Sequence, residues 1–276
     1  MKELAHIIIM AAVELWNAIM DHAFSIIKLD ITSTDMWNII EYLAGTNGKI
    51  TGVATIILTI FILIGFCSNS TDIKRDFSLD SIFKLLIKII ISEFVVINNL
   101  KIFIWIYSIG IGIAGFVKMD EMGALFSAEQ FKDIVEADGI WVSMFIFILS
   151  ILFLIVIVGS GLMLLYEVYL RIVKTCLIIP IGALTWSTLG SGSDSISNTA
   201  LSYFKFAVAT ILEMFMMIFA MKITNVFFVG GLDIFDSILE KGDIFVVIVH
   251  MTCAVFQAIV TVSMVRESRN LIHRLI

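Results

Sequence analysis

Ionisable side chains inside long apolar stretches are the residues of this chain that could do chemistry. Glu167, Arg171 and Lys174 follow one another at spacings of four and three, which places them on one face of a helix. A charge at bilayer depth costs on the order of 3 kcal/mol unless it is paired or hydrated. An acid four residues before a base favours an ion pair, which would fix the depth of the helix. The alternative is a polar site with a function.

A second set of polar residues forms a stripe on a later apolar segment. Ser202, Lys205 and Glu213 share a helical face with the small residue Ala209. Such a stripe is either a contact between helices or the lining of an aqueous path. His250 and Gln257, seven residues apart in the last apolar segment, could meet the same interior. We treat all of these as candidate residues for a pore or for packing.

Other kinds of site find little support in the sequence. The four histidines and three cysteines are scattered, without the spacing of metal ligands and without a pairing of nucleophile and base. The segment Gly45–Lys49 lacks the spacing of a phosphate loop and predicts a turn before the next apolar stretch. We therefore predict no catalytic residue, metal or cofactor. The protein is not expected to be an enzyme, and partner subunits must power any work it does.

The elements that position these residues are long apolar helices. Residues 140–166 contain no formal charge and would form a helix about 40 Å long, whereas the hydrocarbon of a bilayer is about 30 Å thick. Apolar residues make up 60% of the chain and charged residues 15%, against about 25% charged residues in soluble domains. The sequence thus predicts an all-α integral membrane protein that passes through the cell membrane several times.

Charge placement predicts the topology. Five crossings are expected, at residues 50–71, 100–117, 140–166, 199–229 and 244–265. The basic residues Lys74 and Arg75 and the basic C-terminal tail should be internal, and the acidic segments 118–138 and 230–243 external. This assignment holds only if the apolar segment 175–192 does not cross. Because that segment contains Pro180 and several glycines, we expect it to be re-entrant or broken, with the N-terminus external and the C-terminus cytoplasmic.

Residues 1–48 should form a separate N-terminal region before the transmembrane domain of residues 49–276. A polar stripe at helical spacing is expected there, made of Glu14, Asn17, Asp21, Ser25 and Lys28. One interpretation is an external helix lying on the membrane with Trp16 at headgroup depth. The other is a helix packed on neighbouring subunits or partner proteins. A break is also expected at Asn98–Asn99, before the second crossing.

One stretch resembles a known family. It reads Tyr166-Glu-Val-Tyr-Leu-Arg171-Ile-Val-Lys-Thr-Cys-Leu-Ile-Ile-Pro180-Ile-Gly-Ala-Leu, followed by a Gly/Ser hinge and Leu201-Ser-Tyr-Phe-Lys205-Phe. This stretch is similar to the TrbL-type polytopic inner-membrane subunits of type IV secretion and conjugation systems, the family of the sixth VirB protein. The likeness centres on residues 160–225; elsewhere only the hydropathy matches.

The resemblance implies several copies around a membrane channel that passes single-stranded DNA or protein, with secretion ATPases and other channel subunits as partners. Family members often carry a large external central loop, whereas residues 117–139 are short and acidic here and would repel a phosphate backbone. Two alternatives stay open. A small-solute transporter would show internal repeats with paired broken helices. A structural protein of another secretion apparatus would need neither internal repeats nor paired broken helices.

Overall fold

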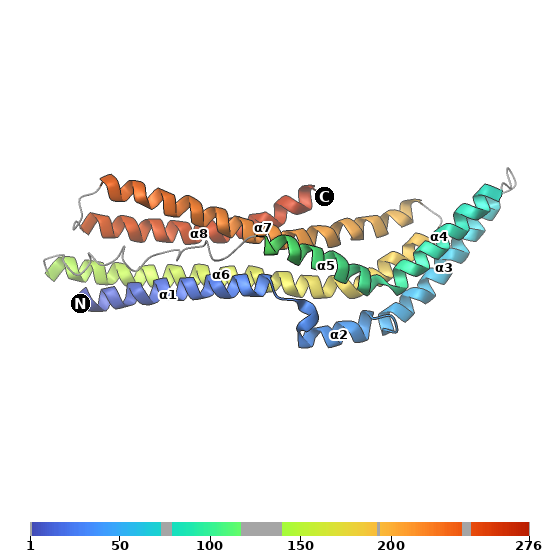
Figure 1. Ribbon diagram of the computed structural model, residues 1–276, viewed down its shortest axis with the longest axis horizontal. Coiled ribbons are helices and arrows are strands. Elements are labelled where there is room, and N and C mark those ends of the chain that lie inside the picture. The colour runs from blue at the N-terminus through green and yellow to red at the C-terminus, as the bar shows by residue number, and fades with distance from the viewer. Residues whose placement is uncertain (1, 73–78, 117–139, 192–193, 239–243, 276) are drawn as a thin grey trace. The chain divides into compact units, whose positions relative to one another are not determined.

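A computed structural model describes residues 2–72, 79–116, 140–191, 194–238 and 244–275 (Figure 1). Within these ranges the regular structure is entirely helical. The elements are α1 (Lys2–Ile27), η1 (Ile31–Ser33), α2 (Asp35–Ala44), α3 (Lys49–Asp72), α4 (Leu79–Ile97), α5 (Asn99–Gly115), α6 (Ile140–Trp186), η3 (Ser187–Ser191), α7 (Asp194–Ile238) and α8 (Ile244–Leu275). The prediction of an all-α protein is confirmed.

The chain divides into two compact units. Unit 1 contains residues 1–29, 113–170 and 213–271, and unit 2 contains residues 30–112, 171–212 and 272–276. The long helices α6 and α7 each contribute one part to either unit. The candidate residues therefore belong to two different surroundings.

Unit 1 is built from α1, the first part of α6, the second part of α7, and α8. Helices α1 and α6 begin at the same end of the unit and run side by side (Figure 1), with Ile19 against Gly161 and His22 beside Tyr169. A Cβ on Gly161 would lie 2.5 Å from Cδ1 of Ile19, so glycine permits this close approach. Helix α7 meets α8 at Thr224 and Thr261.

Unit 2 contains the hairpin of α3 and α4, packed around η3. Leu58 of α3, Val96 of α4 and Ala183 of α6 form its small apolar core. The backbone of α3 approaches closely at Gly65, where a Cβ would meet the Ser191 carbonyl at 2.8 Å. Small residues at such contacts are typical of helices that pack in membranes, where close backbone approach replaces the hydrophobic effect as the driving force.

Large apolar side chains are exposed along most of the helices. On α3 and α6, for example, Ile56, Leu63 and Ile155 are each exposed by 60% or more. Five helical segments are long and apolar enough to cross a membrane, or six if the bent pair of α4 and α5 is counted as one span. Their length and composition are compatible with a multi-pass membrane protein, because lipid is a solvent in which such apolar surfaces are stable.

The predicted break before the second crossing is confirmed. The apolar segments 86–97 and 99–115 meet at an angle of 70° across Asn98. Helix α3 corresponds to the first predicted crossing, and residues 199–229 and 244–265 lie within α7 and α8. The basic pair Lys74 and Arg75 and the acidic segment 118–138 lie outside the described residues, as do residues 239–243 of the second acidic segment.

The predicted break at Pro180 is wrong. Helix α6 continues through Pro180 and ends at Trp186, so the third crossing and the supposed re-entrant segment are parts of one helix of 47 residues. Proline removes a single N–H donor, and a helix tolerates this loss when neighbouring groups bind the freed or adjacent carbonyls.

Trp16, which one of the two interpretations of the N-terminal helix places at headgroup depth, lies in the interior of unit 1. Trp16 is fully buried, together with Ala5, Ile9 and Ala12 on the same face of α1. Helix α1 packs against other helices of its own chain, and its segment Lys2–Ile27 is among those long and apolar enough to cross a membrane. The sequence pattern identified the polar stripe correctly but could not show what covers the opposite face.

Candidate functional site

A hydrogen-bonded cluster in unit 2 surrounds the turn of α6 that contains Pro180. The Asn99 side chain donates to the Ile179 carbonyl (2.9 Å) and accepts from the indole N–H of Trp186 (3.0 Å). The Tyr203 hydroxyl, from α7, donates to the Ile178 carbonyl (3.2 Å). Side chains from two other helices thus bind carbonyls of α6 next to Pro180.

Gly182 makes room for this cluster. A Cβ at Gly182 would overlap both the Tyr203 hydroxyl and the Asn99 carboxamide oxygen. Trp186 completes the arrangement with its ring edge-on to Tyr203, at a centroid distance of 5.6 Å. We call Asn99, Gly182, Trp186 and Tyr203 the α6 latch. The latch fixes the bend between α4 and α5 because Asn99 is the first residue after the break.

Arg171 and Lys174 lie in unit 2 in different settings. Arg171 is 2% exposed and lies near the buried Tyr107 of α5. Lys174 is half-buried and places its ammonium 5.1 Å from the ring centre of Phe206 on α7. Both cations therefore help to join α6 to its neighbours. Such placements suit structural roles better than contact with a substrate.

Unit 1 contains a buried polar interior between α7 and α8. The Thr261 hydroxyl lies 3.2 Å from that of Thr224, and both side chains are buried. Gln257, one turn before Thr261, is fully buried, and neither atom of its carboxamide has a hydrogen-bond partner. The Asn225 carboxamide oxygen also lacks one. A buried amide with an unfilled donor and an unfilled acceptor is a site for water, which can both donate and accept.

The remaining candidates of unit 1 are also buried. Glu213 is 1% exposed, His250 6% and Glu167 9%. Glu167 lies 3.8 Å from Nε of Arg266 on α8, an exposed residue that the sequence analysis did not connect to it. Unit 1 therefore places two carboxyl groups and an imidazole inside a bundle of apolar helices, the pattern expected of a membrane subunit with a polar interior.

The predicted stripe on α7 is exposed in its first part and buried in its second. Ser202 and Lys205, in unit 2, are exposed, whereas Ala209 and Glu213 are buried. Packing between helices accounts for the second part of the stripe. The first part lies on the surface of unit 2.

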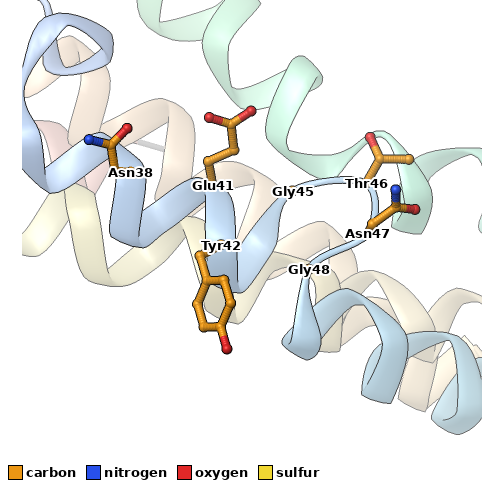
Figure 2. Close-up of a pocket in the computed structure, with 7 residues that line it drawn as sticks. All are labelled: Asn38, Glu41, Tyr42, Gly45, Thr46, Asn47 and Gly48. Carbon is orange, nitrogen blue, oxygen red and sulfur yellow. The ribbon is translucent and has the colours of Figure 1, made fainter.

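A shallow hollow lies at the turn between α2 and α3. Asn38, Glu41 and Tyr42 line it together with residues 45–48, and Figure 2 shows Glu41 and Tyr42 pointing in opposite directions from α2. The turn that the sequence predicted at Gly45–Lys49 is present, with the Gly48 N–H donating to the Gly45 carbonyl. Among the described residues no group of His, Cys, Asp and Glu is arranged to hold a metal ion.

The sequence analysis missed several residues of these clusters. Tyr203 stood within the stretch that carries the family resemblance, and Asn99 was noted only as a helix breaker. Thr224, Asn225 and Arg266 gave no signal, because Thr and Asn are common in membrane helices and Arg266 reads as part of a basic tail. A polar residue within an apolar run would have been the signal for Asn225.

Comparisons with models of protein families, with curated proteins and with solved structures give no significant match to this chain.

Proposed function

We propose that this protein is a membrane subunit of a conjugative type IV secretion system, where several copies scaffold or line the channel for single-stranded DNA or protein. Partner ATPases supply the energy. One observation carries the proposal. Gly182 and Tyr203 of the family-like stretch belong to the α6 latch, in which the Tyr203 hydroxyl donates to the Ile178 carbonyl beside Pro180. The stretch is thus a structural unit and not a chance series of apolar letters.

Two further features support this function. Apolar helices with exposed aliphatic faces provide the lipid contact, and the polar interior of unit 1 provides groups that a membrane subunit uses for assembly or conduction. A bent pair of helices occurs once among the described residues, whereas an inverted-repeat transporter would need a matching second one. This favours a channel subunit over a small-solute transporter. The N-terminus would be external and the C-terminus cytoplasmic.

The test is DNA transfer from a donor strain with an in-frame deletion of the gene. We expect the deletion to abolish transfer and a complementing copy to restore it, while donor growth stays unchanged. The purified membrane complex should also contain secretion ATPases. Unchanged transfer in the deletion strain would refute the proposal, and solute-uptake assays would then become the next experiment.

A further inference from the structure

Three polar side chains of unit 1 are buried with hydrogen-bonding atoms that no described residue binds. They come from three different helices, Trp16 from α1, Asn225 from α7 and Gln257 from α8, and each is at most 3% exposed. The Trp16 indole N–H is an unfilled donor, the Asn225 carboxamide oxygen is an unfilled acceptor, and the Gln257 carboxamide is both. Burial without a partner costs free energy, and water can bind all of these groups. We call the three residues the polar layer.

Contacts with α6 place two residues of the polar layer at the same depth. Helices α1 and α8 both run in the direction of α6 (Figure 1). Ile19 of α1 lies against residue 161 of α6, so Trp16, three residues earlier, is level with residue 158. Arg266 of α8 lies 3.8 Å from Glu167, so Gln257, nine residues earlier, is also level with residue 158. Trp16 and Gln257 therefore lie in one layer of unit 1.

Asn225 belongs to the same layer through the contact between α7 and α8. The Thr224 hydroxyl, next to Asn225 in the chain, lies 3.2 Å from that of Thr261. Gln257 precedes Thr261 by one helical turn, so Asn225 and Gln257 differ in depth by at most about 5.4 Å. Three helices thus bring unfilled donors and acceptors into one short section of the bundle.

Ionisable groups lie on either side of the polar layer. His250, 6% exposed, precedes Gln257 by seven residues on the same face of α8. On the other side, beyond the fully buried Thr261, Glu167 is 9% exposed and lies 3.8 Å from the exposed Arg266. His250 and Arg266 are 16 residues apart, about 24 Å along the helix, whereas the hydrocarbon of a bilayer is about 30 Å thick. Buried polar and ionisable groups therefore follow one another over most of a membrane's depth.

Chains of His and Glu with hydratable groups between them suit the relay of protons through a membrane, and a buried amide that lowers stability is expected at a functional site. We propose that unit 1 conducts protons through transient water between His250 and Glu167, with the polar layer at the middle of the path. Each water accepts one proton and releases another, and the Glu167 carboxylate passes the proton to solvent beside Arg266. One proton leaves for each that enters, so no redox partner is needed. This activity goes beyond the proposed function and does not rest on it.

Proton flux into liposomes tests this path. The purified full-length chain is reconstituted in liposomes that contain a pH-sensitive dye, and a potassium gradient with valinomycin drives proton entry. We expect Gln257→Met to lower the flux roughly tenfold, because an apolar constriction excludes water. The same change removes an unpaired buried amide and is expected to stabilise the fold, so unfolding cannot explain a loss of flux. Asn225→Leu interrupts the layer from α7 and should lower the flux in the same way.

Thr252→Val is the matched control on α8. Thr252 is exposed, and its hydroxyl donates to the Ile248 carbonyl of its own helix, so this variant should conduct like the wild type. The inference is overturned if the wild-type chain passes protons no faster than liposomes without protein. Wild-type flux in both Gln257→Met and Asn225→Leu would also overturn it. DNA transfer is a separate measurement, and a chain that restores transfer but conducts no protons refutes only the proton path.

Discussion

Two clusters, the α6 latch in unit 2 and the interior between α7 and α8 in unit 1, contain buried polar groups of opposite kinds. In unit 2, each polar group of the α6 latch has a protein partner, from Asn99 to the Trp186 indole and the Tyr203 hydroxyl. In unit 1, Gln257 is equally buried but its carboxamide has no partner. A satisfied network specifies one local geometry, whereas an unsatisfied amide destabilises the fold unless water occupies the site. The comparison indicates that the α6 latch is fixed by protein partners, whereas the Gln257 carboxamide is not.

Among the substitutions that test this contrast, a change at Gly182 should have the largest effect on the free energy of unfolding. In Gly182→Leu the new side chain collides with both Asn99 and Tyr203, so the latch cannot form. We expect the free energy of unfolding, measured in mixed micelles, to fall by about 3 kcal/mol, the upper part of the usual range for overpacking. Gly159→Leu is the control on the same helix, because a Cβ at Gly159 meets nothing within 4 Å. Equal losses in the two variants would contradict a specific latch.

Asn99→Leu should have the next largest effect. The change removes both hydrogen bonds of the side chain and leaves the Trp186 indole N–H without an acceptor, at a cost of about 2 kcal/mol. Hydrogen exchange should also rise around the end of α6. The adjacent Asn98 is the matched control, since its side chain donates only to Phe94 within its own helix. A similar loss in Asn98→Leu would mean that helix propensity at the break, and not the latch, dominates.

Gln257→Met should stabilise the protein, whereas the two preceding substitutions should destabilise it. Methionine has nearly the same shape and no hydrogen-bonding groups, so the change relieves the cost of the unpaired amide. We expect unit 1 to become more stable by about 1 kcal/mol, measured by the same unfolding assay. A loss of stability would instead show that ordered water satisfies Gln257. The latch and Gln257 would then differ only in the partner of the buried group, which is protein in the latch and water at Gln257.

Sequence reasoning recovered the elements that depend on local pattern. Charge-free runs predicted the helices because a chain in lipid must satisfy its backbone internally, and the polar pair at residues 98 and 99 predicted the bend. It failed at Pro180, where α6 continues as one helix. Nothing local in the sequence shows that Tyr203 and Asn99 bind the neighbouring carbonyls, 25 and 80 residues away. Local pattern also left open what covers Trp16, since the close packing of α1 on α6 depends on Gly161. Long-range packing leaves no mark in local periodicity.

The smallest expected effect concerns the ion pair between Arg266 and Glu167 in unit 1. Arg266 is 64% exposed at its side chain and lies 3.8 Å from Glu167, so Coulomb attraction is weakened by solvent. Arg266→Gln should lower the free energy of unfolding by less than about 0.5 kcal/mol, and less still at high salt. Glu167→Gln, at the buried end, tests the same contact from the other side. If Arg266→Gln lowers the free energy of unfolding as much as Asn99→Leu, charge stabilises the interior of unit 1. That interior would then be fixed as firmly as the latch, and the contrast between the two clusters would be lost.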